Sequence, residues 1–401
     1  MIYRLIIILA FVLNVAVGYA ANDAIVDSAH SLKDMGFENV RVRVVDGVVY
    51  AAVEATAYRG IFRGAGVALN KLAADFPDAT SFELVILEYK VPEVHVHAVK
   101  DYDKWTVGVD YAVGSVMDNL KMVEQQGSST GKVDVTFYPM VSIDNHRFDK
   151  LCEYLVCLAP SFETTLWKGN RVTVQPIFPV AGNVAKGSSD TYVHLGVASL
   201  QQRFLNSDRW YGDIAGGFFL YDRVGAHARL GYKANKNLGL TLQLGLTGDA
   251  YVDGDGYNVS KPDRFNFMLK ADYYEPNTRL QCSLSAGRFV YGDYGARLDC
   301  TRHFGEYAIG LYGILTGGEH NAGFHFAIPF GGRSQKRKGA LRLRLPQYFD
   351  WEYSMVSYYK YSFEKMGQEY EDRPDKNRSA HYWQARYIEQ YLQKFLDGQM
   401  K

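Results

Sequence analysis

One run of alternating residues constrains this chain more than any other feature. In LGLTLQLGLTGDAYV, residues 238–252, every second residue from Leu238 to Leu246 is leucine, and Gly, Thr and Gln lie between them. Side chains of an extended strand alternate between its two faces, whereas a helix would scatter these leucines around its axis. The stretch is therefore predicted to be a β-strand with one apolar face.

The next run repeats the alternation and adds charge. Phe265, Phe267 and Leu269 share one face, while Lys270 and Asp272 lie on the other. A soluble β-sandwich rarely buries Lys and Asp while exposing Leu and Phe, but a membrane barrel turns apolar side chains toward lipid and polar ones toward its lumen. The pattern favours an antiparallel transmembrane β-barrel.

Alternating segments separated by turn signals recur from residue 131 to 365, which we predict to be the barrel. We expect about fourteen strands, with twelve or sixteen as alternatives. The predicted strands are 132–141, 151–166, 170–180, 191–204, 210–221, 224–233, 238–252, 264–274, 279–290, 294–304, 307–316, 322–330, 340–346 and 352–363. A composition of 38 Gly, 30 Tyr and 22 Phe against 11 Pro suits many strands with tight turns and aromatic belts.

The connections between these strands fall into two kinds. The turns WKGN, LNSD, ANKN, EPNT and GE are short, and several alternating with them, such as SIDNHRFDK, AGNVAKGSSD and DGDGYNVSKPD, are long. Outer-membrane barrels have short periplasmic turns and longer outer loops. The basic loop GGRSQKRKG then falls on the periplasmic side, where its length has no evident reason.

The first twenty residues indicate export. Arg4 precedes an apolar run, and Gly18-Tyr19-Ala20 is a small-x-small cleavage site, so residues 1–20 are predicted to be a signal peptide. The apolar run is shorter than the ~20 residues that a membrane-spanning helix needs. Together with the alternating strands, this predicts a protein of the bacterial cell outer membrane, in contact with outer-membrane lipid.

Residues 21–103 are predicted to form a small periplasmic α/β domain of the order αββαββ. Helical spacing covers residues 23–35, strands flank Asp46-Gly47, a second helix covers residues 58–75, and two strands follow. Residues 104–130 are predicted to be a linker with one strand-like run. Residues 366–401 are predicted to be a polar linker and a C-terminal amphipathic helix that docks on the periplasmic domain or plugs the barrel mouth.

Several polar and charged residues of the predicted strands should face the lumen and contact a polymer there. They are His227, Arg229, Lys233, Lys270, Asp272, Arg279, Arg297, Asp299, Tyr312 and His325. Charges of both signs suit a hydrated pore, and they equally suit an interior closed by salt bridges. Both interpretations stay open at this stage.

The four cysteines are an even number in a chain predicted to be exported, so disulfides are permitted. Cys282 and Cys300 lie at matching distances from the turn near Tyr291 and share the apolar face, so they are predicted to be cross-strand neighbours. A disulfide between them is one interpretation. The other interpretation is that they are two small lipid-facing residues without a disulfide, because directly paired cross-strand cysteines strain disulfide geometry.

The remaining chemical motifs are weak. His95 and His97 share a strand face, but the sequence places no carboxylate or Cys beside them, so no metal site is predicted. DGDGYN, residues 253–258, resembles the start of a calcium loop but lacks its closing Glu. His194 with Ser199 or His325 at the membrane rim is the residual pattern for a barrel hydrolase acting on lipid or glycan. We predict no catalytic residues and no cofactor, and a net charge of +0 gives no indication of nucleic acid binding.

Several stretches resemble the YjbH family of exopolysaccharide-biosynthesis outer-membrane proteins. In the N-terminal part they are GFENVRVRV, residues 36–44, the YAAVEATAYR that follows, and the closing strand pair with residues 85–91. In the barrel they are residues 151–183, 286–305 and 317–330. The resemblance implies an outer-membrane component that works alongside periplasmic polysaccharide-secretion proteins, and it brings no catalytic site. The sequence thus predicts a barrel that assists export or surface assembly of an exopolysaccharide, with a rim enzyme and a closed structural barrel as alternatives.

Overall fold

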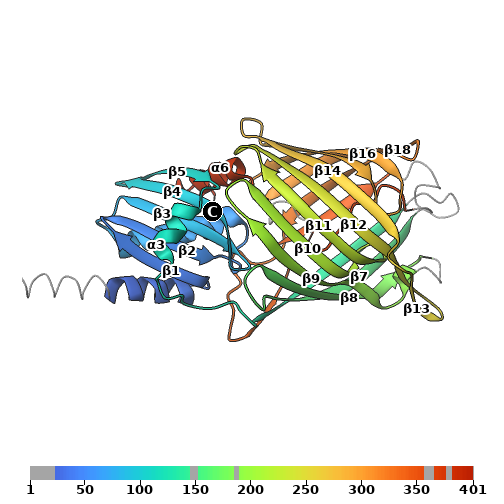
Figure 1. The fold of residues 1–401 in the computed structure, drawn as a ribbon, viewed down its shortest axis with the longest axis horizontal. Helices are drawn as coiled ribbons and strands as arrows, with labels where there is room; N and C mark the ends of the chain where they lie inside the picture. The colour runs from blue at the N-terminus through green and yellow to red at the C-terminus, as the bar shows by residue number, and fades with distance from the viewer. Residues whose placement is uncertain (1–22, 145–151, 185–188, 356–364, 376–381, 401) are drawn as a thin grey trace, which may run out of the picture.

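The computed structural model describes residues 23–144, 152–184, 189–355, 365–375 and 382–400. The chain is mainly β, and the described residues form one five-stranded and one fifteen-stranded sheet. Figure 1 shows the smaller sheet with its helices at one end of the long axis and the larger sheet at the other. None of the helices in the described part of the chain has the length and apolar character of a membrane-crossing helix.

The N-terminal domain follows the predicted order and adds one strand. A helix covers residues 23–34 and ends before Gly36, whose φ of 102° is easy only for glycine. The remaining elements are β1 Glu38–Val45, β2 Val48–Glu54, α2 Ile61–Asp75, β3 Ser81–Glu88, β4 Val91–Asp101, β5 Lys104–Asp110 and α3 Gly114–Leu120. The strands lie in the order β1-β2-β3-β4-β5. The stretch predicted to be a linker therefore contributes the fifth strand, because residues 104–110 pair along β4.

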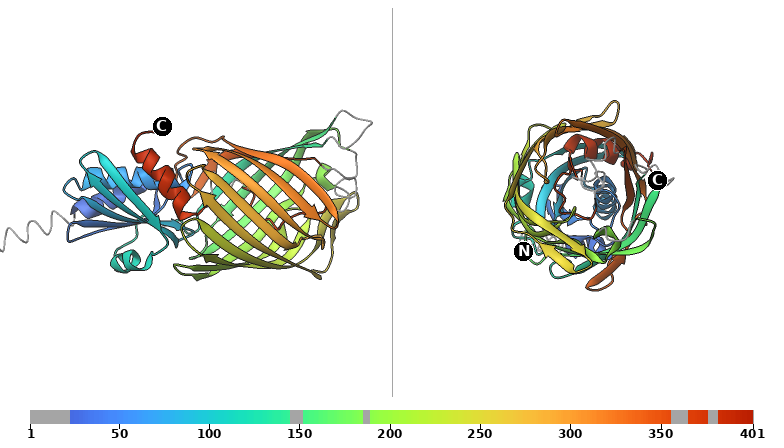
Figure 2. Two further views of the ribbon diagram at one scale, coloured as in Figure 1. Left: turned by 90° about the horizontal axis from the view of Figure 1, so that it is seen from above. Right: turned by 90° about the vertical axis from the view of Figure 1, so that its right-hand side faces the viewer.

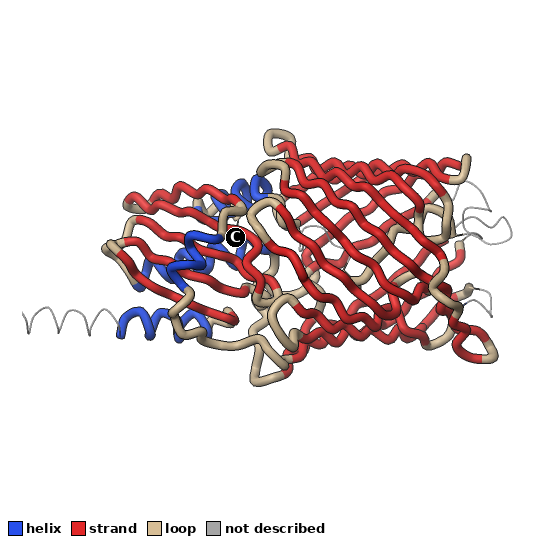
Figure 3. The backbone as a smooth tube through the Cα atoms, in the orientation of Figure 1, coloured by secondary structure: helices blue, strands red, loops and turns tan. Residues whose placement is uncertain are grey.

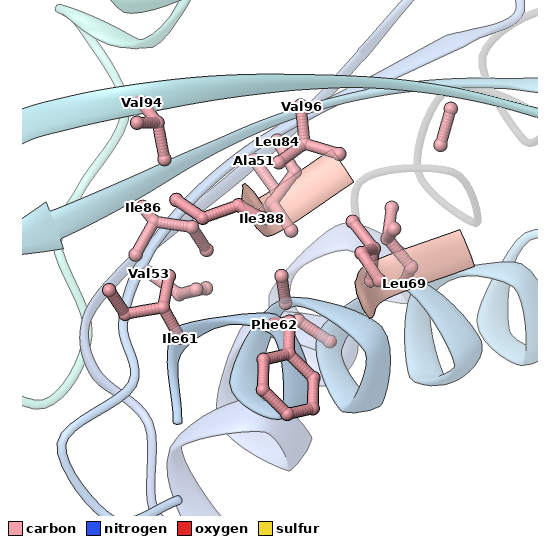
Figure 4. Close-up of a cluster of buried hydrophobic side chains, with 14 of the residues drawn as sticks. Ala51, Val53, Ile61, Phe62, Leu69, Leu84, Ile86, Val94, Val96 and Ile388 are labelled. Atoms are coloured by element: carbon pink, nitrogen blue, oxygen red, sulfur yellow. The ribbon is translucent and has the colours of Figure 1, made fainter. Parts of the chain in front are cut away.

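The core of this domain includes a helix from the far end of the chain. α6, Ala385–Leu396, packs against α2 and β5, and Ile388, Tyr391 and Leu392 are buried in the same cluster as Phe62 and Leu69. Figure 4 shows Ile388 among the side chains of the sheet and of α2. The structure has the C-terminal helix docked on the N-terminal domain, and the same helix also contacts the end of the large sheet, where Gln390 donates to the carbonyl of Pro276.

The large sheet contains a strand at each of the fourteen predicted positions within the described residues. Its strands are β6 Val133–Asp144, β7 Glu153–Thr164, β8 Asn170–Gly182, β9 His194–Asn206, β10 Trp210–Phe219, β11 Arg223–Lys233, β12 Leu238–Asp253, β13 Gly256–Val259, β14 Arg264–Glu275, β15 Leu280–Arg288, β16 Tyr294–Phe304, β17 Tyr307–Thr316, β18 Glu319–Pro329, β19 Leu341–Arg344 and β20 Tyr348–Ser354. β13 was not predicted; it extends β12 in a small hairpin. The tube in Figure 3 shows these strands running obliquely, side by side.

The alternation of apolar and polar residues in the sequence gives the large sheet two faces of different character. Leu269 and Leu311 are 59% and 67% exposed, while the neighbouring Met268 and Tyr312 are buried on the opposite face. Figure 2 shows the sheet curving round, so that one face is convex and the other concave. We call the concave face the inner face. The strands β11, β12 and β14 pair residue by residue without interruption, so every second residue of each strand lies on this face.

The two ends of the large sheet are occupied by consecutive pieces of one stretch of chain. β19 pairs with β6, and β20, which follows after three intervening residues, pairs with β18. The β19–β6 pairing is parallel, so the prediction of an entirely antiparallel sheet is wrong at this point. β19 and β20 run in the same direction and form one pass interrupted near Pro346, which lacks the N–H that a strand ladder uses. The predicted strands 340–346 and 352–363 are therefore one interrupted pass, of which residues 356–364 lie outside the described residues.

The basic loop between β18 and β19 has a structural reason for its length. Ser334 forms a bridge with Tyr58, the amide of Gln335 donates to the carbonyl of Ala57 at 2.7 Å, and the amide of Arg59 donates to Arg333. The loop thus reaches back to the N-terminal domain. Its cationic side chains take part, since Arg337 contacts the carboxylate of Glu38 at 3.0 Å.

All five short turns lie at the end of the large sheet that faces the N-terminal domain and α6. Each turn makes a hydrogen bond there: Gly169 to Tyr89, Asn206 to Pro92, Lys236 to Arg386, Pro276 to Gln390 and Glu306 to Arg59. The shared position of the short turns is as predicted. Among the long connections, SIDNHRFDK falls largely outside the described residues.

Candidate functional site

The inner face of the large sheet is occupied by a segment from near the C-terminus. Residues 365–375 form no helix or strand, and we call them the interior segment. Met366 packs with Met268, Phe289 and Ile314, and Tyr370 packs with Phe219. These contacts cover part of the inner face.

The carboxylate of Asp372 is the main anchor of the interior segment. Its Oδ2 atom lies 2.9 Å from Arg171 Nη2, 3.1 Å from Arg229 Nη2 and 3.6 Å from His227 Nε2. Arg229 also donates through Nε to Asp213 at 2.9 Å. Arg171 and Asp372 are almost completely buried, so this is an ion-pair network removed from water, where loss of one partner is costly.

Two further residues of the segment bind the inner face. The ring of Tyr370 stacks on His227 with a centroid distance of 3.7 Å. Glu369 accepts a hydrogen bond from Ser285 at 2.5 Å and lies 3.7 Å from Lys270. The segment is therefore held by charge, by aromatic contact and by a hydroxyl.

The ends of the segment are held by different parts of the molecule. Lys365 Nζ lies 2.6 Å from Asp222, in the turn between β10 and β11. Arg373 contacts Glu88 of β3 at 3.1 Å, so this end reaches the N-terminal domain. A cavity of about 40 Å³ lies beside it, with Glu163 and Arg344 among its lining residues.

A second inner-face cluster contains four of the predicted lumen residues. Arg297 lies 2.9 Å from Glu352 and 3.3 Å from Asp299, and its guanidinium sits 3.9 Å from the ring centre of Tyr312. His325 Nε2 lies 3.1 Å from Asp299 Oδ1. These residues neutralise one another across β16, β17, β18 and β20.

The other predicted lumen residues lie in three places. His227, Arg229 and Lys270 contact the interior segment, as described above. Lys233 lies at the domain end, with its ammonium 4.7 Å from the ring centre of Tyr111, and the carbonyl of Asp272 accepts a hydrogen bond from Gln384. The predicted wall position of Arg279 is wrong, since Arg279 lies in the turn between β14 and β15 with a φ of 57°.

Sequence reasoning missed the residues that complete the Asp372 network. Arg171 and Asp213 lie at inner positions of predicted strands, so the alternation that found His227 could also have found them. Asp372 and Tyr370 lie in a stretch predicted to be a polar linker, and no local pattern marks them. Their role depends on a contact between positions 201 residues apart.

The residues considered for a rim hydrolase do not form a nucleophile–base pair. The register of β9 shifts at Gly196, so His194, which pairs with Ile177, lies on the same face as Ser199. The two residues are still five positions apart along the strand, which is too far for a hydrogen bond between their side chains. His194 Nδ1 contacts the carbonyl of Tyr192, at 2.9 Å. His325 contacts both Asp299 and Thr301 through the same Nε2 atom. In the described part of the chain no carboxylate orients its other nitrogen in the way a catalytic triad requires.

The expectation that no carboxylate lies near His95 and His97 is wrong. Strand pairing brings Glu83 of β3 to 2.6 Å from His97 Nδ1 and Asp110 of β5 to 3.3 Å from His95 Nδ1, and Glu83 also contacts His95. Burial alone would lower the pKa of His95, but the hydrogen bonds and charges of Asp110 and Glu83 raise it to about 9. Within the described residues no group of three or more such side chains has the geometry to hold a metal ion.

Cys282 and Cys300 are direct cross-strand neighbours, as predicted. They occupy opposing positions in β15 and β16, with their Sγ atoms 3.0 Å apart, and both are free thiols in this structure. In the DGDGYN turn, Asn258 donates to Asp253 at 2.7 Å. This contact closes the β12–β13 hairpin within the loop itself.

No family profile matches the chain, and no curated protein matches it.

Proposed function

We propose that this protein is an outer-membrane β-barrel with a periplasmic α/β domain, and that it assists export or surface assembly of an exopolysaccharide. The observation that carries the proposal is the inverted polarity of the large sheet. Leu269, Leu298 and Leu311 are exposed on the convex face, while charged side chains such as Arg171 and Asp372 are buried within. Lipid is the solvent that suits such a surface.

The pairing of the sheet ends supports closure of the barrel. β19 binds the first strand and β20 the last, so one interrupted pass spans both ends. β20 also approaches β6 directly, where the indole N–H of Trp351 donates to the carbonyl of Val141 at 2.9 Å. A closed sheet has no free edge to satisfy in lipid.

The asymmetry of the two ends supports the orientation. The short turns, the basic loop and the N-terminal domain gather at one end, the one expected to be periplasmic. The signal-peptide prediction for residues 1–20 and the resemblance to the YjbH family agree with this placement. Since α2 and α6 cover one side of the N-terminal sheet, a periplasmic secretion protein would bind the other side, where α3 covers only part of the strands.

A closed structural barrel is the second candidate, and the interior segment favours it. The network of Asp372 with Arg171 and Arg229 places buried ion pairs in the interior. Planar-bilayer recording of the purified protein separates the two candidates. Steady conductance supports an export route, whereas a barrel that is permanently closed passes no steady current.

The experiment that tests the proposal is deletion of the gene in its native cells, followed by assay of polysaccharide outside the cell and in the periplasm. We expect polymer to accumulate in the periplasm and to be lost from the surface. Complementation with the wild-type chain is the control, and heat-dependent mobility in gels verifies that the complementing protein is folded. Normal surface polymer of unchanged size and composition would overturn the export function.

A further inference from the structure

The cations on the inner face depend on the interior segment for their counter-charges. Among the described residues, Asp372 is the only carboxylate within 4.0 Å of Arg171, and Glu369 is the only one near Lys270. Arg229 is shared between Asp372 and the wall residue Asp213. Without the segment, these cations would lie on a concave surface with too few anions.

Several buried hydrogen-bonding groups next to Arg171 also have no partner among the described residues. Thr173 and Ser199 lie opposite each other on β8 and β9, and Gln201 lies opposite Arg171. The hydroxyls of Thr173 and Ser199, the Oε1 of Gln201 and two nitrogens of Arg171 make no hydrogen bond with any described residue. All four side chains are more than nine-tenths buried. Buried polar groups normally have partners, so this patch is built for more hydrogen bonds than the segment supplies.

We propose that this inner-face patch binds an acidic polysaccharide, and that the interior segment occupies the binding site by presenting Glu369 and Asp372 in place of the polymer's carboxylates. The inference rests on the proposed export function and names its substrate class. Arg171, Arg229 and Lys270 would bind uronate carboxylates, for which a guanidinium has matching geometry. Thr173 and Ser199 would bind sugar hydroxyls, and the rings of His227 and Phe219 would offer a stacking surface once Tyr370 has left.

The test measures binding of a polyuronate to the full-length folded protein in detergent by titration calorimetry. The probe is a polygalacturonate oligosaccharide, and a neutral dextran of the same length is the comparison. The release variant carries Glu369→Gln and Asp372→Asn, which keep side-chain shape and remove both counter-charges. The matched control carries Asp118→Asn and Asp397→Asn, two exposed carboxylates away from the inner face.

We expect the release variant to bind polygalacturonate at least tenfold more tightly than the wild type and the control, with no gain for dextran. Adding Arg171→Gln to the release variant should abolish that gain. Trypsin cleavage after Lys365 reports displacement of the segment and should be faster in the release variant, while heat-dependent gel mobility verifies that the barrel is folded.

Three results would overturn the inference. They are equal affinity for dextran and polygalacturonate, an affinity that Arg171→Gln leaves unchanged, and a folded release variant that gains no polygalacturonate binding, whether or not trypsin reaches Lys365. A failure of the proposed export function would give a different result from these three. Selective polyuronate binding together with normal surface polymer in the deletion strain would leave the binding site intact and remove its proposed use.

Discussion

The strands of both sheets in this protein have one apolar face, but that face is buried in the N-terminal sheet and exposed in the large sheet. In the N-terminal sheet, Leu84 and Ile86 are buried against α2 and α6. In the large sheet, Leu240 and Leu246 are exposed on the convex face, and the buried side chains include arginines and aspartates. Alternation alone therefore gives the two faces of a strand. The proposed membrane location accounts for the difference, because water favours burial of the apolar face and lipid favours burial of the polar one.

The C-terminal chain contributes to both regions in the same contrasting way. α6 adds apolar side chains such as Ile388 and Leu392 to the domain core, whereas the interior segment adds Glu369 and Asp372 to the charged interior of the large sheet. Each part of the C-terminal chain thus matches the region that it enters. Four substitutions test how far the contrast holds.

The largest effect is expected in the domain core. Phe62 is fully buried and its ring lies 5.6 Å from that of Tyr391. Phe62→Ala should lower the free energy of unfolding of the domain by about 3–5 kcal/mol, because it removes contacts and leaves a cavity. Chemical denaturation followed by tyrosine fluorescence measures the loss. The heat-dependent gel mobility of the protein, which reports whether the large sheet is folded, should not change. A loss below about 1 kcal/mol would contradict the packing described for α2 and α6.

The next effect tests the convex face. Leu269 lies midway along β14 and is mostly exposed. Leu269→Arg should destabilise the protein in lipid by about 2–4 kcal/mol if this face contacts the bilayer centre. Folding titrations into lipid vesicles measure it, and Tyr273→Arg, nearer the strand end, is the control with an expected cost of about 0–1 kcal/mol. Equal and negligible costs at both positions would show that water, not lipid, covers this face.

A smaller effect tests the contact between the two regions. The hydroxyl of Tyr391 on α6 donates to the carbonyl of His303 on β16 at 3.0 Å, within a buried site. Tyr391→Phe keeps the ring and leaves that carbonyl without this donor, at a cost of about 1–2 kcal/mol. Limited proteolysis between the regions should become faster in the variant. If the two regions separate no more easily than in the wild type, this hydrogen bond does not hold them together.

The smallest effect concerns pH. The pKa of His95 is raised in the folded state to about 9 by Asp110 and Glu83, above the ordinary value of 6.5 for histidine. The stabilisation is fully present below about pH 6.5 and is lost as the pH rises through about 9. We expect less than about 1 kcal/mol, because Asp110 is partly exposed and solvent screens the pair. Thermal unfolding between these pH values measures it, and His95→Gln should flatten the dependence; an unchanged slope in the variant would assign it to another group.

Local patterns were sufficient for much of the fold and for part of the site. The turn at Asp46-Gly47 and the strands of the large sheet were predicted because turn geometry and side-chain alternation are set by neighbouring residues. The same alternation placed His227 and Arg229 on the inner face. It misplaced Arg279, because a strand boundary shifted by one residue moves a side chain into a turn.

The sequence by itself determined where strands form, which residues share a face and which connections are short, since these depend on residues close together in the chain. Only the tertiary structure decided that Asp372 meets Arg171, that Glu83 meets His95 and that α6 completes the core of the N-terminal domain. Those contacts join distant positions whose pairing is chosen by burial and charge in the folded chain. No local pattern carries that information, because a polar linker and a charged interior segment have the same composition.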